Sequence, residues 1–417
     1  MDFSFEFDGV RNALAPVRAI SPADGKHYFF GYYDLQPYSP DGRRHLAARI
    51  PFDMVLNGPD DVMEFGWIED GKFEKLFDTT CWNFQQGILA TYQRSGGNVI
   101  FYNILDREAG CYRTVRHDLD TGKKDYSSMA CGTVSHDGTH GLGINFSRIW
   151  DFRPGYGYPN LPDPYADIPH PAEDGVFLCD FDKGTTKMLV SCEQLRSLFP
   201  LDGRENSKMV VNHITLNPAG DRYLFLYRSF PDPNRIVPPG KTRWTTVLFS
   251  GDMEGNVKFL FDEMVSHYWW EDNEHMVAFC RPAGERNGIW RVNMVDGSYE
   301  EIRGDEEGPK SLRAVSGAHD IHCSISPDGR FMIGDGYPDL DGYRKIYIHE
   351  MATGRTEILL ETYSPYADTQ LGIPNGTKEA RCDLHARWNR DGTRVSFDAI
   401  ARGHREIFEI DMTKLKW

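Results

Sequence analysis

The sequence predicts an all-β protein built as a single seven-bladed β-propeller with four-stranded blades. Three observations support this fold: one turn motif recurs seven times, a second turn class follows six of those turns, and β-branched or aromatic runs separate them. The chain has 417 residues, of which 40% are hydrophobic and 26% charged, which excludes a coiled coil, a collagen-like chain and a disordered protein. We therefore expect one domain over residues 1–417.

The first turn class predicts an inner hairpin in every unit. Its clearest form is Ser-Pro-Asp-Gly, which joins two β-rich apolar runs, as expected of a β-hairpin. The seven turns begin at Ser39, Arg94, Ser135, Asn217, Glu271, Ser326 and Asn389.

The second turn class predicts an outer hairpin in the first six units. These turns begin at Asp70, Thr121, Lys183, Glu254, Asp296 and Thr353. Seven units average about 60 residues, which is longer than a compact propeller repeat of roughly 40–45 residues, so long loops must decorate the blades. The widest gap between inner turns contains Arg153-Pro-Gly-Tyr-Gly-Tyr158. We expect an inserted loop over about 149–175 that overhangs the channel mouth.

Charge and cysteine content restrict the partners and the compartment. With 46 Lys plus Arg against 62 Asp plus Glu, the net charge of -16 disfavours binding to nucleic acid or to an anionic membrane. The N-terminus has no signal-peptide pattern and no segment is apolar enough to span a membrane, so we expect a soluble, cytoplasmic protein, or a periplasmic or secreted one if a signal peptide was trimmed. The eight cysteines lack C-x-x-C spacing, which favours reduced thiols.

Four consecutive units carry a histidine six residues before the aspartate position of the inner turn. They are His213, His267, His322 and His385. Because the innermost strand of each blade runs along the central channel, equivalent positions should form a ring. Imidazole nitrogens suit zinc or another transition metal, so we expect a divalent ion, zinc or manganese, held by these four residues. The alternative is a neutral, hydrogen-bonded lining of the channel.

Arginines and tyrosines supply further candidates. Near the end of the second strand of four units stand Arg49, Arg148, Arg228 and Arg281, which together could form a cationic bowl for a carboxylate or sulfate. Each could instead pair with a neighbouring carboxylate. Tyr33 and Gln86 place polar groups on segments that should reach the channel. In the long loop, Tyr156 and Tyr158 could stack on sugar rings or simply anchor the loop.

Several longer strings resemble the seven-bladed propeller polysaccharide lyases, of the ulvan lyase type and, more distantly, oligogalacturonate lyase. They are Tyr32-Tyr33-Asp34, Arg153-Pro-Gly-Tyr-Gly-Tyr158, His322-Cys-Ser-Ile-Ser-Pro-Asp-Gly and Arg381-Cys-Asp-Leu-His385. The resemblance extends from about residue 27 to 410. It implies a carbohydrate lyase that cleaves a uronic-acid-containing oligosaccharide or polysaccharide by β-elimination, with the metal and the arginines binding the uronate.

The resemblance also implies roles for individual residues. In the oligogalacturonate lyases a metal held by channel histidines neutralises the carboxylate, and His267 and His385 match that pattern best. In the ulvan type, where the metal is structural, Arg148 matches a catalytic arginine. The ulvan-type tyrosine falls at about Gly132, and the second-blade histidine is replaced in the segment 82–86, so that catalytic set is not intact.

We therefore expect catalysis by Arg148, Arg228, Tyr33 and Gln86, and substrate binding by Arg49, Arg281, Tyr156 and Tyr158. Tyr33, Tyr156 and Arg228 are the available general bases. Two other readings stay open: a non-catalytic propeller that binds a sugar or a protein, and a metal-dependent hydrolase on the same scaffold. The sequence leaves open the identity of the sugar and whether the substrate is a polymer or an oligomer.

Overall fold

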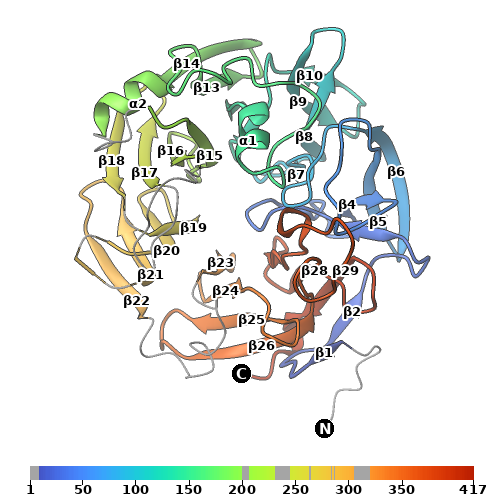
Figure 1. Ribbon diagram of the computed structural model, residues 1–417. Coiled ribbons are helices and arrows are strands. Elements are labelled where there is room, and N and C mark those ends of the chain that lie inside the picture. Colours follow the sequence, from blue (N-terminus) through green and yellow to red (C-terminus); the bar gives the residue numbers. More distant parts are fainter. Residues whose placement is uncertain are drawn as a thin grey trace.

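The computed structural model describes residues 9–199, 206–230, 245–262, 264–282, 284–285, 287–304 and 320–417. These residues form seven antiparallel sheets arranged in a ring around a central axis (Figure 1), and we call the side-chain-lined space along this axis the channel. The prediction of a seven-bladed β-propeller with four-stranded blades is confirmed. Among the described residues, no helix has the length and apolar character needed to cross a bilayer.

The first three blades follow the order of the chain. Blade 1 consists of β3 (His27–Phe29), β4 (His45–Ile50), β5 (Met63–Glu69) and β6 (Lys72–Thr79). Blade 2 consists of β7 (Thr91–Tyr92), β8 (Val99–Asp106), β9 (Cys111–Asp118) and β10 (Lys124–Tyr126). Blade 3 consists of β11 (Cys131–Val134), β12 (His140–Gly143), β13 (Gly175–Asp180) and β14 (Thr185–Ser191).

Blades 4 to 6 repeat the pattern. Blade 4 consists of β15 (Met209–Leu216), β16 (Arg222–Ser229), β17 (Thr246–Asp252) and β18 (Val257–Phe261). Blade 5 consists of β19 (Val265–Trp270), β20 (His275–Cys280), β21 (Gly288–Asn293) and β22 (Tyr299–Gly304). Blade 6 consists of β23 (His322–Ile325), β24 (Phe331–Asp335), β25 (Tyr343–Glu350) and β26 (Thr356–Tyr363). All thirteen predicted turns connect neighbouring strands of one blade.

The seventh blade closes the ring with strands from both ends of the chain. Residues near the C-terminus supply β27 (Arg387–Trp388), β28 (Arg394–Ala399) and β29 (Glu406–Asp411), and β2 (Val17–Ala19) adds the outermost strand by pairing with β29. The last unit needs no second turn because its fourth strand comes from the N-terminus. β1 (Val10–Arg11) continues in the same way and pairs with β26 as a fifth strand of blade 6.

Short helices lie in the connections. The helix α1 (Phe146–Phe152) begins at Asn145, whose side chain accepts a hydrogen bond from the backbone of Arg148. It leads into the long loop between β12 and β13, and it was not predicted. The helix α2 (Cys192–Leu198) follows β14, and the 3₁₀ helices η1 (Lys378–Ala380) and η2 (Met412–Lys414) flank blade 7.

We predict that ring closure makes a measurable contribution to stability. Deleting residues 1–19 removes β2 and leaves the edge of β29 unpaired, so the melting temperature should fall by at least about 5 °C. Deleting residues 1–12 removes only the extra strand of blade 6 and should cost less. Thermal unfolding followed by circular dichroism compares the two, and equal melting temperatures would contradict this role for β2.

Candidate active site and metal centre

The four predicted histidines meet in the channel. Their ring centroids follow one another around it, at 6.0 Å between His213 and His267, 4.0 Å between His267 and His322, and 4.5 Å between His322 and His385. All four side chains are buried. The shared offset from the inner turn therefore corresponds to a shared place in space.

β-Bulges explain why the histidines on β15 and β19 reach the channel. The register of β15 against β16 shifts between Asn212 and Thr215, and that of β19 against β20 shifts between Val265 and Tyr268. Within the first bulge, His213 has a left-handed backbone with φ of 49°. An extra residue in one strand re-aims the side chain at that position, and such bulges often occur beside active sites.

Two tyrosines from blade 1 fill the space between the histidines. The ring of Tyr32 meets His213, His322 and His385 with centroids 5.3, 6.0 and 4.8 Å away. Tyr33 donates its hydroxyl hydrogen bond to the backbone oxygen of Tyr268 at 2.8 Å. The Tyr33 hydroxyl also lies 3.2 Å from Nε2 of His213 and accepts from the backbone N–H of Tyr268. Its hydroxyl is thus fully engaged within the protein, which argues against the role of general base.

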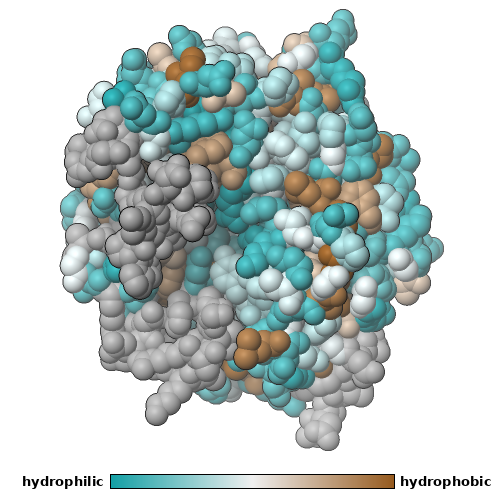
Figure 2. Space-filling view, in the orientation of Figure 1, coloured by the Kyte–Doolittle hydropathy of each residue, from teal (hydrophilic) through white to brown (hydrophobic). Residues whose placement is uncertain are grey.

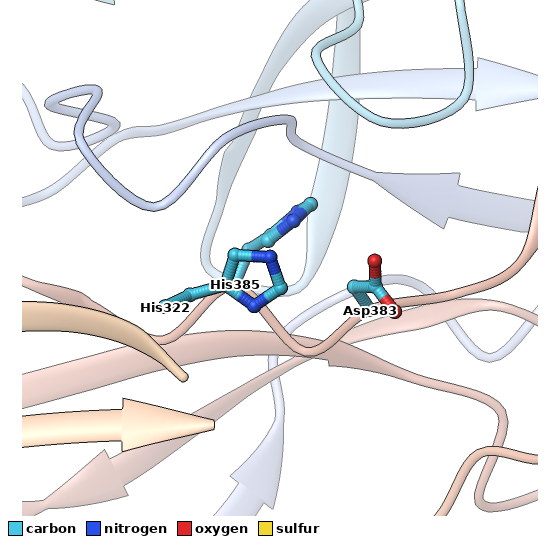
Figure 3. A group of neighbouring side chains, drawn as sticks. All are labelled: His322, Asp383 and His385. Atoms are coloured by element: carbon cyan, nitrogen blue, oxygen red, sulfur yellow. The ribbon is translucent and has the colours of Figure 1, made fainter. Parts of the chain in front are cut away.

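One cluster in this ring has the arrangement of a metal site (Figure 3). His322, Asp383 and His385 each offer one ligand atom, and these atoms lie within 4.8 Å of one another. Nδ1 of His385 faces the backbone oxygen of Gly31 at 2.9 Å, and Nδ1 of His322 faces Asp335 at 3.2 Å. Nε2 of each imidazole is buried and has no hydrogen-bond partner among the residues that the structure describes. Two unpaired nitrogens beside a carboxylate fit a divalent transition metal.

Two arginines hold Asp383 in place as a carboxylate. Arg344 donates to its Oδ1 at 2.6 Å, and Arg381 lies 2.7 Å from its Oδ2. Burial alone would raise the pKa of Asp383, but these two guanidinium groups hold that pKa well below its usual range. Burial also lowers the pKa of His385 well below its usual value, so this imidazole is neutral and able to coordinate.

The metal cluster differs from the expected set of four histidines. Among the described residues, this is the one group of three or more candidate ligands, and it omits His213 and His267. Both ring nitrogens of His213 already face partners, the Tyr33 hydroxyl and the backbone oxygen of Ser266. Nδ1 of His267 faces Asp320 at 2.8 Å. Asp383 was missed because the six-residue count looked only for histidine, although it stands two residues before His385.

A cationic cluster borders the metal group. Arg153 lies over the ring of Tyr156 at 4.4 Å, and Arg381 donates to the Tyr156 hydroxyl at 3.0 Å. Tyr156 in turn meets Tyr32 edge to face at 6.2 Å. Arg228 is buried, its Nε has no partner, and burial together with nearby Arg153 lowers its pKa. The start of the long loop therefore reaches the histidine ring, as expected. Hydrophilic residues surround the hollow at the centre of the molecule in Figure 2.

Arg148 occupies a different environment from the predicted one. Its side chain is 1% exposed and its five N–H donors are all used within the protein. They bind the Asp163 carboxylate and the backbone oxygens of Met209, Tyr165, Ile168 and Pro169. Arg148 thus ties the long loop to blade 4 and has no donor left for a substrate carboxylate.

The remaining predicted residues lie in varied places. Arg49 pairs with Glu64 and stacks on Phe73 within blade 1. Tyr158 is buried against Phe146, and its hydroxyl accepts from Asn103, so it belongs to the packing of the loop.

Two predicted residues lie at the ends of segments near the channel. The backbone oxygen of Gln86 approaches Gly31, next to His385. Arg281 directly follows β20, where its backbone N–H donates to Met264. The structure brings neither side chain into a described contact with the histidines.

Comparisons with known proteins agree on the fold. The sequence matches no protein-family model and no curated protein. A solved structure described as oligogalacturonate lyase in complex with manganese is similar with a TM-score of 0.63 and 14% identity, over 100% of this chain and 98% of that one. The oligogalacturonate lyase of Vibrio parahaemolyticus gives a TM-score of 0.62 and 14% identity, over 99% and 97%. Neither is an ulvan lyase, and identity this low establishes the propeller fold alone.

We predict that Arg148 acts on stability. Arg148→Ala removes the closer of the two cations that pair with the buried Asp163 carboxylate, leaving Lys208 at 3.4 Å, and it takes the donor from four backbone oxygens, so the free energy of unfolding should fall by about 3 kcal/mol or more. Arg44→Ala, which breaks a partly exposed pair with Glu69, is the matched control and should cost about 0–1 kcal/mol. Chemical denaturation measures both. An Arg148→Ala protein of normal stability and lost activity would instead place Arg148 in catalysis.

Proposed function

We propose that this protein is a metal-dependent carbohydrate lyase that cleaves a uronate-containing oligosaccharide by β-elimination. The observation that carries the proposal is the position of Arg228 and Arg153. Arg228 is buried, and the charge of Arg153, whose side chain is about a quarter exposed and lies 3.6 Å from Glu379, is near enough to lower the pKa of Arg228. Both stand beside a cluster of unpaired metal-ligand atoms, in a protein with a net charge of -16. An anionic ligand would balance the charge of these arginines. The propeller fold shared with two oligogalacturonate lyases supports the same activity.

The metal would be held by Nε2 of His322, Nε2 of His385 and one oxygen of Asp383. Three protein ligands leave coordination positions open, which is typical of catalytic rather than structural sites. When bound, a divalent ion supplies a Lewis acid that neutralises the uronate carboxylate and makes the C5 proton more acidic. Manganese or zinc suits the mixed nitrogen and oxygen ligands.

The arginines would bind and activate the sugar. In β-elimination the C5–H bond breaks, its electron pair forms the C4–C5 double bond, and the C4–O bond breaks with a proton delivered to the leaving oxygen. Arg153, whose side chain is about a quarter exposed, is placed to bind a carboxylate at the mouth. Arg228, a buried cation beside Arg153, is the candidate to stabilise the negative charge that grows on the uronate as the C5 proton leaves, and the neutral imidazole of His267 is the candidate to accept that proton.

His267, held by Asp320, would present its imidazole to the bound sugar as a further polar group. Nδ1 of His267 is held by Asp320, which leaves Nε2 to face the ligand side of the ring. Burial, with His322 nearby, lowers the pKa of His267 to about 4, so this imidazole is neutral at pH 7. A neutral imidazole positioned by a carboxylate can accept a hydrogen bond from a sugar hydroxyl or relay a proton.

We predict that metal content depends on the blade 6 and blade 7 histidines. His385→Ala removes one of three ligands and should reduce bound manganese or zinc at least tenfold, as measured by elemental analysis after dialysis against the metal. His213→Ala is the control, since both ring nitrogens of His213 face protein partners, and it should retain the metal. Loss of metal in His213→Ala, with retention in His385→Ala, would overturn this assignment.

We predict that Arg228→Ala lowers turnover of a uronate oligosaccharide at least a hundredfold. Loss of a donor aimed at developing charge typically costs roughly 2.7–4 kcal/mol in the transition state. The assay follows the short-ultraviolet absorbance of the conjugated double bond that elimination creates. Arg44→Ala, far from the pocket on blade 1, should keep normal turnover.

The same assay separates the alternatives. Hydrolysis would release reducing ends without the ultraviolet absorbance, and a non-catalytic binding propeller would give no product at all. Near-normal elimination by Arg228→Ala would remove Arg228 from the mechanism. No elimination on any uronate oligosaccharide by metal-loaded protein would contradict the proposed activity.

A further inference from the structure

A second cavity lies at the other end of the channel. It has a volume of about 90 Å³, enough for several water molecules or a small ligand. Its walls come from the turn-side ends of the inner strands of blades 2 to 5, including Arg94, His136, Pro218 and Trp269. None of the four channel histidines or Asp383 lines it.

A wall of aromatic side chains separates this cavity from the metal group. Tyr268 lines the cavity, and its ring stacks on His213 with centroids 4.3 Å apart. Tyr33 is bound to both the N–H and the oxygen of Tyr268. The hydroxyl of Tyr268 donates to the backbone oxygen of His213. Because these three residues are buried and joined by hydrogen bonds, they separate this cavity from the metal group.

The cavity walls carry polar groups that no described side chain satisfies. The Asp34 carboxylate accepts no hydrogen bond from another described residue, and burial raises its pKa to about 6. The His136 imidazole and the Trp269 indole N–H likewise have no hydrogen-bond partner among the described residues. All three side chains are half-buried, so their polar groups are open to water or to a ligand in the cavity.

Arg94 adds a positive charge to the polar groups of the cavity wall. It donates to the backbone oxygen of Asp34 and lies 5.5 Å from the Trp269 ring centroid, so the protein holds its guanidinium at the cavity wall. One carboxylate and one guanidinium balance each other, in contrast to the arginine-rich pocket on the other side of the wall. A carboxylate acceptor, guanidinium and indole donors, and an imidazole that can do either match the alternating donors and acceptors of sugar hydroxyls.

We propose that this cavity is a second binding site, for a neutral monosaccharide or a polyol of that size. It is distinct from the metal group in position and in charge, so its ligand differs from the uronate expected there. The assignment does not depend on the proposed lyase activity, because it rests on the cavity and its polar groups alone.

Calorimetric titration of the metal-free protein with galactose, glucose, xylose and rhamnose tests the site without any turnover. At least one of these sugars should bind with one-to-one stoichiometry. Asp34→Asn, which removes a charged acceptor at constant shape, should weaken that binding about tenfold or more. His385→Ala, which changes a proposed metal ligand on the other side of the wall, should leave sugar binding unchanged.

Circular dichroism shows whether Asp34→Asn folds. If it does not, Trp269→Phe is the second variant, and loss of the indole N–H should weaken sugar binding. Absence of binding by every neutral sugar would overturn the proposal. Binding that disappears in His385→Ala and persists in Asp34→Asn would also overturn the proposal, because the sugar would then occupy the side of the aromatic wall that holds His385. Failure of the lyase assay with retained sugar binding would refute the proposed function and leave this site intact.

Discussion

The pairing of β2 with β29 is the constraint on which the rest of this structure depends. A propeller blade contacts mainly its two neighbours, so nothing within blades 4 to 7 alone forces their inner strands toward one axis. Closure of the ring brings together His213, His267, His322 and His385, which are spread over more than 170 residues of sequence. The N-terminal strand therefore organises a site to which it contributes no side chain.

Buried charge gives that site its chemical character. Most buried arginines here have a carboxylate close by: Arg344 and Arg381 hold Asp383, Arg387 holds Asp398 and Arg405 holds Asp53. Such pairs make up for the desolvation of both ions and keep the geometry rigid. Among the residues that the structure describes, Nε of Arg228 has no hydrogen-bond partner, and its neighbour Arg153 adds repulsion that Asp320 only partly offsets. A cation left uncompensated among paired ones is where an anion has most to contribute.

The sequence predicted the fold more completely than the site. The turn motifs can be recognised from a few neighbouring residues, because the turn itself requires a left-handed backbone that favours glycine. Gly42 and Gly329 are examples. They located the seven inner hairpins and the six outer hairpins but not the connections between the second and third strands, and the absent seventh outer turn is explained by β2. The helix α1 (Phe146–Phe152) escaped because its residues were read as the end of a strand at Arg148 followed by a loop from about 149.

The six-residue offset shared by the repeats predicted that the histidines converge, but it did not predict which of them are free to bind a metal. Which imidazole keeps a free nitrogen depends on contacts between distant segments, such as Tyr33 with His213 and Gly31 with His385. For the same reason, the spacing of Arg148 resembled that of a catalytic arginine, although Asp163 and four backbone oxygens take up its donors. Arg153 and Arg381 gave no periodic signal because they lie outside the repeat register, whereas Asp320 and Asp383 each stand two residues before a channel histidine and were missed because only histidines were compared.

Mass spectrometry of the products formed from a defined uronate oligosaccharide by the manganese- or zinc-loaded protein tests the central claim most directly. Elimination without addition of water gives fragments whose new non-reducing end is an unsaturated uronate, lighter by one water than the hydrolytic product. The account predicts these unsaturated fragments, and predicts that they vanish when the metal is removed by a chelator and return when it is restored. Saturated fragments, or unsaturated fragments that form equally well without metal, would contradict it.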